Sequence, residues 1–361
     1  MHQIDTYRNF HALDGIRGLA AFAVVCWHIP DPMLDLDFHS AYLAVDLFFC
    51  LSGFVICKSY EAKLNGDLQV GHFMAIRLVR LYPLYSIAVS IAVAQLIVDT
   101  LLFRSELAAD AAVLTAWFAF ALLPVPPGLA GVNHLFPLCP PAWSLYLELL
   151  VNAVYGAVSR WLTLRRIAAV LAGSAATLAV ASWWFHGLDT GYGWHNALGG
   201  IPRVAFSFFL GVALYRSRHF MSFRVRHGAL VAMAMVAVVL SVPVPYSLRP
   251  VYDVLAIVLA FPAIILIGSM ASDGPRVSRY CFVLGELSYP LYVLHIPVLA
   301  AFVSGWNKAA SAPPDDAGSV SGALFLIVLV LLSGLVLNLV DGPLRQELRR
   351  RLFQPKPVSA I

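Results

Sequence analysis

Charged residues are scarce in this sequence. Asp, Glu, Lys and Arg make up 12% of the 361 residues, whereas 60% are hydrophobic. A soluble globular domain carries about 25% charged residues. The composition therefore excludes an ordinary soluble enzyme, and no nucleic-acid partner is expected. It predicts an all-α, polytopic protein whose main partner is the lipid bilayer, with little chain outside the membrane.

Two further kinds of signal are missing. None of the five cysteines has metal-ligand spacing, and Cys26, Cys50 and Cys57 lie inside apolar runs. We therefore expect reduced core thiols and no metal site. The N-terminus has no basic region followed by a small-residue cleavage site, so no cleavable signal is expected. No tandem repeat is evident.

Apolar segments of membrane-spanning length recur along the whole chain. About 20 apolar residues cross a bilayer as a helix. Ten such spans are predicted, at about 13–30, 41–58, 77–102, 143–158, 166–184, 200–216, 228–245, 252–270, 281–303 and 321–341. An eleventh run, 111–124, is short and leads into a Pro-rich loop, so we interpret it as non-spanning. The spans form one domain, 1–345, followed by a basic tail, 346–361.

Loop charges set the predicted orientation, because Lys and Arg are enriched in cytoplasmic loops. With ten spans and a cytoplasmic N-terminus, 20 of the 24 Lys and Arg residues fall on the inner side. If 111–124 crossed, everything after it would invert and this bias would collapse. We therefore predict that both termini are cytoplasmic. The four basic residues left outside are Arg104, Arg203, Arg249 and Lys308.

The first span carries ionisable residues that are costly in hydrocarbon. Arg17 and His28 are eleven residues apart, so they leave the same face of one helix, about 16 Å apart along its axis. Taken singly, they fit a flanking anchor and an interfacial histidine equally well. The pair on one face, with further ionisable residues in other spans, favours function.

The predicted depths sort the other polar residues into two layers. The outer layer contains His28, Asp46, Glu148, Arg203 and His295, and the inner layer contains Arg17, Arg77, Arg80 and Glu286. Buried charges seek partners, so each layer predicts a cluster. Arg77 and Arg80 share a face at a predicted helix N-terminus, which suits a phosphate group, although positive-inside anchoring is the alternative.

The outer layer fits general-base chemistry. A histidine takes a proton from a hydroxyl near neutral pH, and Glu148 or Asp46 can orient the imidazole of His28. Ser144 shares a helix face with Glu148 but also fits a helix N-cap, and Trp143 also fits an interfacial anchor.

Five segments resemble a known family. LDGIRGLAAFAVVCWH resembles the motif of the acyltransferase-3 family in which ten residues separate an arginine from a histidine. VDLFFCLSGFVI, RLVRLYP, PPAWSLYLE and GELSYPLYVLHIPV are similar to its other blocks, in the same order. By this resemblance, His28 and Arg17 match the essential pair. The remaining matches are Arg77 and Arg80, the fourth-block residues Trp143, Ser144 and Glu148, and His295 in the last block.

The resemblance implies transfer of an acyl group, expected to be acetyl, from cytoplasmic acyl-CoA to a hydroxyl, in a bacterial inner membrane. The implied acceptor is a cell-surface or lipid-linked carbohydrate, such as an exopolysaccharide or O-antigen sugar. Asn152 departs from the family pattern, which often has Tyr there. The chain also ends without an appended hydrolase-like domain, which resembles the short exopolysaccharide-acetylase type.

The residues and the resemblance support one mechanism. The phosphates of acyl-CoA, the donor substrate, bind Arg77, Arg80 and Arg17, and its extended arm reaches the outer layer. His28 then deprotonates the acceptor, while Ser144, Arg203 or Tyr292 stabilises the oxyanion. Substrate contacts are expected from Trp143, Arg203 and Tyr292, and a transient acyl-histidine is the alternative route.

A different class of function stays open on the residues alone. Buried Arg, Asp, Glu and His also occur in proton-coupled transporters of small anionic or sugar-like substrates. No inverted repeat is evident here, which favours the enzyme. The sequence leaves four points open: the acyl group, the acceptor, whether the transfer is direct or two-step, and whether the protein is a monomer or a homodimer.

Overall fold

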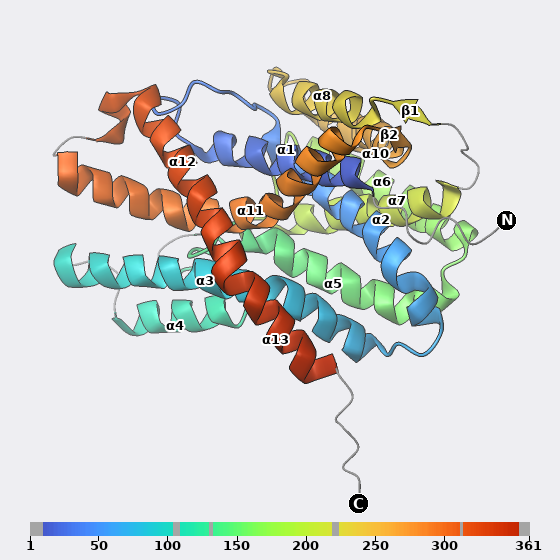
Figure 1. Ribbon diagram of the computed structural model, residues 1–361, viewed down its shortest axis with the longest axis horizontal. Coiled ribbons are helices and arrows are strands. Elements are labelled where there is room, and N and C mark those ends of the chain that lie inside the picture. Colours follow the sequence, from blue (N-terminus) through green and yellow to red (C-terminus); the bar gives the residue numbers. More distant parts are fainter. Residues whose placement is uncertain (1–9, 104–108, 130–132, 219–223, 311–312, 354–361) are drawn as a thin grey trace, which may run out of the picture.

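Helices make up nearly all of the fold. The computed structural model describes residues 10–103, 109–129, 133–218, 224–310 and 313–353. The helices (Figure 1) are α1 (His11–His28), α2 (Ala44–Asn65), α3 (Val70–Phe103), α4 (Ala109–Phe120), α5 (Ala142–Val158), α6 (Leu164–Trp184), α7 (Gly200–Ser217), α8 (Gly228–Ser241), α9 (Arg249–Leu255), α10 (Phe261–Ser269), α11 (Pro275–Ala310), α12 (Ser319–Val336) and α13 (Gly342–Phe353). Short helical turns precede α2, α6, α7 and α12 at Ala41–Leu43, Ser159–Trp161, Ala197–Gly199 and Pro314–Ala317.

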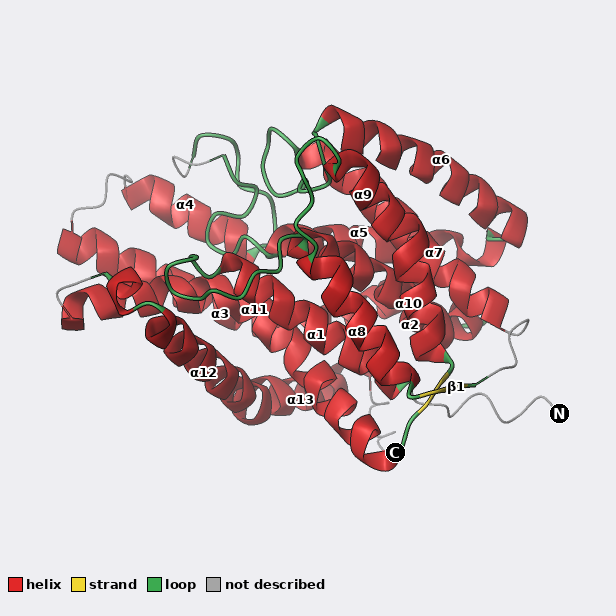
Figure 2. Cartoon of the chain, turned by 90° about the horizontal axis from the view of Figure 1, so that it is seen from above, coloured by secondary structure: helices red, strands yellow, loops and turns green. Residues whose placement is uncertain are grey.

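The two ends of the bundle differ in their connections. At one end two-residue strands, β1 (Val225–Arg226) and β2 (Ala271–Ser272), pair in parallel. We name this end, where α1 begins and α2 finishes, the basic end. Longer loops lie away from the strands (Figure 2); their described residues are 29–40, 121–129, 133–141 and 185–196. We name that end, where α1 finishes at His28, the loop end. The charges of Arg104 and of the tail beyond 353 lie outside the described residues.

Each of the ten predicted spans coincides with a helix or with consecutive helices. Within the described residues, seven helical segments are long and apolar enough to cross a membrane, which makes the chain a multi-pass membrane protein. These segments contain α2, α3, α6, α7, α9 with α10, α11, and α12 with α13. Three predicted spans, formed by α1, α5 and α8, are not among them. The number ten and the orientation of the termini therefore stay predictions.

Helix α1 lies inside the bundle, which explains its poor match to a lipid-facing span. Ile16, Ala20 and Ala23 are fully buried, and the helix packs mainly against α11 and α8. Small residues allow this close approach. A Cβ added at Gly285 of α11 would lie 2.5 Å from the Cβ of Asp14, so any larger residue there would push α1 and α11 apart. The two helices run in the same direction.

Helices α2 and α7 also pack at close range. A Cβ added at Gly53 would collide with the backbone carbonyl of Phe208 on α7. The sequence predicts close helix approach or a narrow channel at Ser52–Gly53, and the structure has close approach on the side of Gly53. Ser52 faces the other way, toward the cavity described below.

Helix α4 returns along α3 (Figure 1) instead of running the length of the bundle. The hydroxyl of Tyr82 donates to the carbonyl of Phe120 at 2.8 Å, and that of Tyr85 donates to the carbonyl of Ala119 at 2.6 Å. Its 12 residues extend about 18 Å, which is less than the hydrocarbon thickness of about 30 Å. Helix α5 then starts from the loop end.

The C-terminal helices cross the outside of the bundle. Between α12 and α13 the chain forms a π-helical turn, Leu337–Asp341, and α13 packs on α3 (Figure 1). Part of the predicted basic tail, residues 346–353, therefore belongs to a packed helix. A second π-helical turn, Ala256–Ala260, joins α9 to α10.

Candidate active site

A cavity of about 380 Å³ opens between α1, α2, α3, α5, α11 and α13. Its lining includes five cationic side chains and three carboxylates, in addition to apolar residues. The cations are Arg17, Lys58, Arg77, Arg80 and Arg345, and the carboxylates are Asp14, Glu148 and Glu286. We name it the basic cavity. All four members of the predicted inner layer line it.

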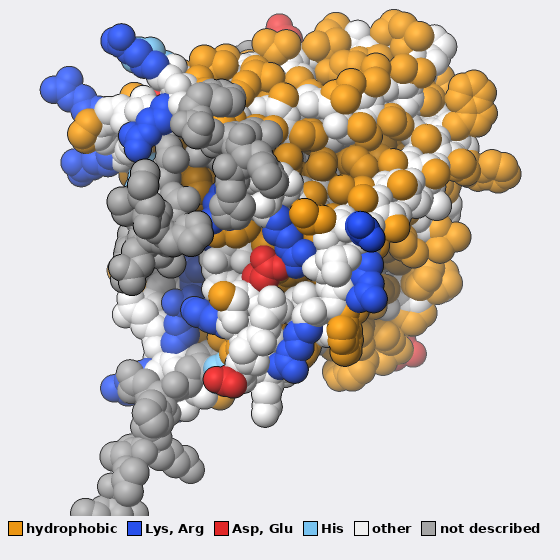
Figure 3. Space-filling view, turned by 90° about the vertical axis from the view of Figure 1, so that its right-hand side faces the viewer, with side chains coloured by type: hydrophobic (Ala, Val, Ile, Leu, Met, Phe, Trp, Pro, Cys, Tyr) orange, Lys and Arg blue, Asp and Glu red, His pale blue; other side chains and the backbone are white. Residues whose placement is uncertain are grey.

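The basic cavity lies toward the basic end of the molecule. Figure 3 looks onto this end and shows Lys and Arg side chains gathered there, with few acidic side chains among them. Lys58, on α2, lies 4.4 Å from the ring centroid of Phe10, and His11, on α1, also lines the cavity. An anion that approaches this end therefore meets a positive field.

Arg17 is held between α1 and α11. Its Nε donates to the Ser288 hydroxyl at 2.8 Å, and its Nη2 donates to the Gly285 carbonyl at 2.9 Å. Asp14, one turn earlier on α1, accepts from the same Nη2 at 3.2 Å. The glycine at 285 makes this geometry possible, because it brings the α11 backbone within reach of α1.

Arg77 and Glu148 form a buried ion pair across α3 and α5. Arg77 Nη2 lies 2.8 Å from Glu148 Oε1, and the Ser52 hydroxyl donates to the same oxygen at 2.8 Å. Sequence reasoning placed Glu148 in the outer layer, as one of two carboxylates that orient His28. The structure corrects this placement, because α5 runs down to α3 and Glu148 reaches the arginines of the inner layer.

Arg80 differs from its neighbours in forming no ion pair. Among the described residues, its guanidinium has no hydrogen-bond or ion-pair partner; the charges of Arg77 and Arg17 repel it, while the charge of Glu148 attracts it. One face of the Arg80 side chain lines the basic cavity. A guanidinium that forms no ion pair and lies next to two others has the chemistry to bind an anion such as phosphate.

Ser144 and Tyr292 meet at the deep side of the basic cavity. The Ser144 hydroxyl donates to the carbonyl of Pro141 at 3.0 Å, so it accepts the 2.8 Å bond from the Tyr292 hydroxyl. Both side chains are buried and both line the cavity. The N-cap role that the sequence left open for Ser144 is wrong, because Ser144 lies inside the first turn of α5, Pro141 is the N-cap residue, and the Ser144 hydroxyl donates to a carbonyl instead of accepting from a backbone N–H.

His28 and His295 lie together beyond this pair, with ring centroids 4.7 Å apart. His28 Nδ1 lies 2.8 Å from the Val24 carbonyl, and His295 Nδ1 lies 2.8 Å from the Tyr292 carbonyl. A carbonyl only accepts, so each Nδ1 carries a proton, and in the neutral form of each ring the lone pair is on Nε2. His295 Nε2 is buried without a partner in the described part of the chain. The orientation of His28 thus comes from its own helix and not from a carboxylate.

Asp46 and Arg203 form a second buried ion pair, toward the loop end. Both side chains are at most 1% exposed, and Arg203 Nη2 lies 2.6 Å from Asp46 Oδ2. Arg203 also donates to the carbonyls of Thr190 and Tyr42, at 2.7 and 2.8 Å, and Ser207 donates to Asp46 Oδ1 at 3.3 Å. Every nitrogen of Arg203 therefore has a partner within the protein. The structure does not place Asp46 against His28.

The loop between α6 and α7 covers Trp143. Gly191 packs on the indole, where any Cβ would collide with the ring, and the Arg203 guanidinium lies 5.3 Å from the ring centroid on another side. Trp143 is therefore buried, which excludes the interfacial anchor. In the same loop, burial raises the pKa of Asp189 above its ordinary value, while Arg203 and Arg249 oppose that rise. The positive φ of Gly191 fits a glycine at this turn.

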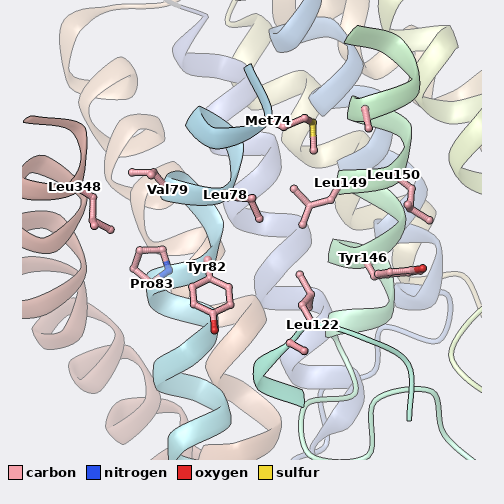
Figure 4. A pocket seen from close by; sticks show the side chains of 12 residues that line it. Met74, Leu78, Val79, Tyr82, Pro83, Leu122, Tyr146, Leu149, Leu150 and Leu348 are labelled. Atoms are coloured by element: carbon pink, nitrogen blue, oxygen red, sulfur yellow. The ribbon is translucent and has the colours of Figure 1, made fainter. Parts of the chain in front are cut away.

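A second hollow, of about 500 Å³, lies on the other side of α3 and α5. Figure 4 shows its lining, which contains leucines from α3 and α5, Tyr82 and Tyr146, and Leu348 from α13. It has no ionisable side chain apart from the two tyrosines. We name it the apolar groove. Its chemistry suits hydrocarbon and not an anion.

Comparison with known proteins decides the family. The sequence pattern of the family described as "Acyltransferase domain" matches residues 10–339. The chain belongs to the acyltransferase-3 family. It is 27% identical over 389 residues to "Acyltransferase MdmB" of Streptomyces mycarofaciens, covering 94% of this chain and 92% of that protein.

A shorter relative matches about half of this acyltransferase. The chain is 42% identical over 183 residues to "Protein 2 in picA locus" of Rhizobium radiobacter, which covers 48% of this chain and 95% of that protein. No solved structure matches the chain.

The acyltransferase thus brings its predicted site residues together in three groups. Arg17, Arg77, Arg80 and Glu148 surround the basic cavity, with Ser144 and Tyr292 at its deep side. His28 and His295 form the second group, and Asp46, Arg203 and Trp143 form the third.

Sequence reasoning missed two cationic residues of the basic cavity, Lys58 and Arg345. Arg345 was assigned to the end of the domain, next to a string of tail arginines. Its spacing of four from Asp341 on a helix was the available signal.

Proposed function

We propose that this membrane acyltransferase moves an acyl group, in particular acetyl, from cytoplasmic acyl-CoA to a hydroxyl of a cell-surface or lipid-linked carbohydrate. One observation carries the proposal. Helix α1 presents a guanidinium in the basic cavity at one end, and an imidazole whose Nδ1 is bonded to its own helix at the other. A donor with anionic phosphates and a reactive group at the end of a long arm needs this arrangement.

In this proposal the donor phosphates bind Arg17, Arg77 and Arg80. Arginine contacts phosphate oxygens in bidentate fashion. Arg80 forms no ion pair within the described residues, whereas Asp14 and Glu148 fix the orientations of Arg17 and Arg77. The enrichment of Lys and Arg at the basic end supports a cytoplasmic orientation of that end, and therefore donor entry from the cytoplasm. A bacterial inner membrane is the setting that this chemistry implies.

The transfer step is proposed to begin at His28. Its Nε2 takes the proton of the acceptor hydroxyl, whose oxygen attacks the thioester carbonyl carbon. The carbon–sulfur bond then breaks, and the imidazolium returns the proton to the leaving thiolate of CoA. Atoms and charge balance without a metal or an external oxidant. An acyl-histidine formed on Nε2 is the two-step alternative.

His295 replaces the carboxylates as the proposed partner of His28. When His28 is protonated, its Nε2–H can donate to the unpartnered Nε2 of His295, whose Nδ1 already donates to Tyr292. A buried acceptor without a partner gains from such a bond. Asp46 then acts through structure, by neutralising Arg203.

The deep side of the basic cavity supplies a candidate oxyanion donor. The Tyr292 hydroxyl now donates to Ser144, and it lies between the cavity and the imidazole pair. A thioester that reaches His28 from the cavity passes this bond. Turning the Tyr292 hydroxyl onto the carbonyl oxygen then provides the stabilisation that acyl transfer requires.

Label transfer from radiolabelled acetyl-CoA in inverted membrane vesicles tests the proposal. Vesicles come from a host that makes its surface polysaccharide, and carry the wild type, His28→Ala or His39→Ala. His39 lies in the exposed loop after α1, so it serves as the matched control. Label is expected in carbohydrate with the wild type and the control, and none with His28→Ala.

Each other outcome removes a defined part of the proposal. Equal labelling with His28→Ala excludes His28 as the base. Labelling only when acetyl-CoA is added outside right-side-out vesicles, where it reaches the outer face alone, excludes a cytoplasmic donor. Absence of label with any acyl-CoA, combined with gradient-driven uptake of an anion or a sugar, supports the proton-coupled transporter instead.

A further inference from the structure

The C-terminal helix contributes a charged residue to the basic cavity. Arg345 lies one turn into α13 and lines the cavity with residues of α1, α3 and α11. The π-helical turn Leu337–Asp341 precedes it. Such turns shift the register of the following helix and are frequent at functional sites. Here the turn sets which face of α13 meets the cavity.

Arg345 is paired with a buried carboxylate from that turn. Asp341 is fully buried and forms an ion pair with Nη2 of Arg345. The side chain of Arg345 is itself 24% exposed. Its other guanidinium nitrogens have no hydrogen-bond partner among the described residues. A guanidinium has five N–H donors in a fixed plane, so most of its donors stay available on the cavity side.

This arrangement repeats that of two other arginines of the cavity. Arg17 is oriented by Asp14 and Arg77 by Glu148, each through one Nη2 nitrogen. Arg345 has the same kind of carboxylate partner through the same atom. Pairing with a carboxylate lowers the entropy lost when the guanidinium binds a second anion, since its position is already fixed.

The other charged residues of α13 do not share this position. Arg350 and Arg351 pair with Glu347 on the exposed side of the helix. Leu348, three residues after Arg345, lines the apolar groove on the side of α3 (Figure 4). The packing of Leu348 holds α13 against α3, with Arg345 turned toward the cavity and Arg350 toward solvent.

We infer that Arg345 is a fourth phosphate-binding arginine of the basic cavity, held by Asp341, and that it binds a phosphate group of the acyl-CoA donor. The inference rests on the proposed function. It makes the C-terminal helix part of the donor site. A guanidinium bound to phosphate through two N–H groups keeps its remaining Nη2–H on Asp341, so the buried carboxylate is never left without its cation.

Equilibrium binding of CoA to the full-length protein in detergent tests this, because it needs neither an acceptor nor turnover. The variants are Arg345→Gln, Arg345→Lys and the control Arg350→Gln. We expect the Kd of CoA to rise about tenfold with Arg345→Gln, which is about 1.4 kcal/mol. The lysine variant should be intermediate, since it lacks the planar fork, and Arg350→Gln should bind as the wild type does.

Two additions keep the result interpretable. Arg345→Gln leaves Asp341 buried without a cation, so the double variant Asp341→Asn/Arg345→Gln is measured beside it and should fold with the same weak binding. Acetyl-pantetheine, which has no nucleotide phosphates, serves as a second donor. Its KM should be the same in the wild type and in Arg345→Gln.

The outcomes separate this inference from the function on which it rests. No binding of CoA to the wild type would remove the donor site and this inference with it. Equal CoA binding by the wild type and the folded double variant would overturn the role of Arg345 alone. An equal loss with acetyl-pantetheine would show that Arg345 supports the fold of the cavity and not a phosphate.

Discussion

Two of the arginine–carboxylate pairs inside the bundle, Arg203–Asp46 and Arg77–Glu148, differ in what they leave unpartnered. Arg203 and Asp46 are 1% and 0% exposed, and every nitrogen of Arg203 has an acceptor within the protein. Arg77 and Glu148 are 4% and 17% exposed, line a cavity, and leave Arg77 Nε without a partner.

The contrast gives a criterion for telling buried ion pairs that stabilise the fold from those that could bind a ligand. Both pairs satisfy the rule that a buried charge needs a counter-ion. Only the pair beside Arg80 has surplus donors and an open space in front of them. We therefore propose that the Arg203 pair stabilises the loop end and that the Arg77 pair takes part in donor binding.

Breaking the Arg203–Asp46 pair should have the largest effect on stability. Asp46→Asn leaves Arg203 charged and buried without a counter-ion, so we expect the free energy of unfolding to fall by about 3–5 kcal/mol. Thermal unfolding of the protein in detergent measures it. Asp37→Asn, in an exposed loop, is the control. Wild-type stability of Asp46→Asn would mean that the pair is not structural.

The stability of the protein should respond differently to single and double substitutions in the Arg77–Glu148 pair. Glu148→Gln strands Arg77, and we expect a loss of about 1–3 kcal/mol of unfolding free energy, because the cavity admits water to part of the site. The double variant Arg77→Gln/Glu148→Gln should recover most of that stability but keep a raised KM for acyl-CoA. A double variant with both wild-type stability and a wild-type KM for acyl-CoA would place Arg77 outside the donor site.

Arg80→Gln should separate binding from stability most cleanly. Arg80 forms no ion pair, so its removal relieves repulsion with Arg77 and Arg17 and loses only the weaker attraction of Glu148. We expect unchanged thermal unfolding and a KM for acyl-CoA raised about tenfold with kcat unchanged. Arg165→Gln, an exposed arginine at the start of α6, is the control. A change in kcat alone would argue against a role in donor binding.

The smallest change is expected from Ser52→Ala. It removes one of two hydrogen bonds to Glu148 Oε1, while Arg77 still compensates the carboxylate. A neutral donor of this kind contributes about 1 kcal/mol. The free energy of unfolding should fall by that amount, and the KM for acyl-CoA should change less than twofold. A large rise in KM would mean that Ser52 itself contacts the donor.

Much of the fold could be predicted from hydrophobic runs. Each predicted span falls on a helix, because about 20 apolar residues in a membrane protein have few other conformations. The depth of Glu148 could not be predicted in the same way. Helix α5 begins at Ala142, as the sequence predicts. The sequence does not show how deep in the bundle that first residue lies, so counting residues from the end of the span gives no depth for Glu148.

The residues that contact the charged side chains could not be predicted from the sequence either. Arg17 and His28 share a face of α1 as predicted, and their partners Ser288 and His295 lie on α11 as a consequence of packing. Asp46 and Arg203 were placed in one layer, but only the fold shows that they neutralise each other. Arg345 was hidden among tail arginines because a π-helical turn redirects its helix.

Helices α1 and α11 touch at Gly285 and run in the same direction, with polar contacts at both ends of their shared length. Inserting one residue into α1 after Gly18 would turn His28 by about 100° and shift it by about 1.5 Å. The new position would face away from His295. A shorter or longer donor arm could thus be accommodated only by matched insertions or deletions in both helices. Natural length variation is therefore expected in the loops and not in these two helices.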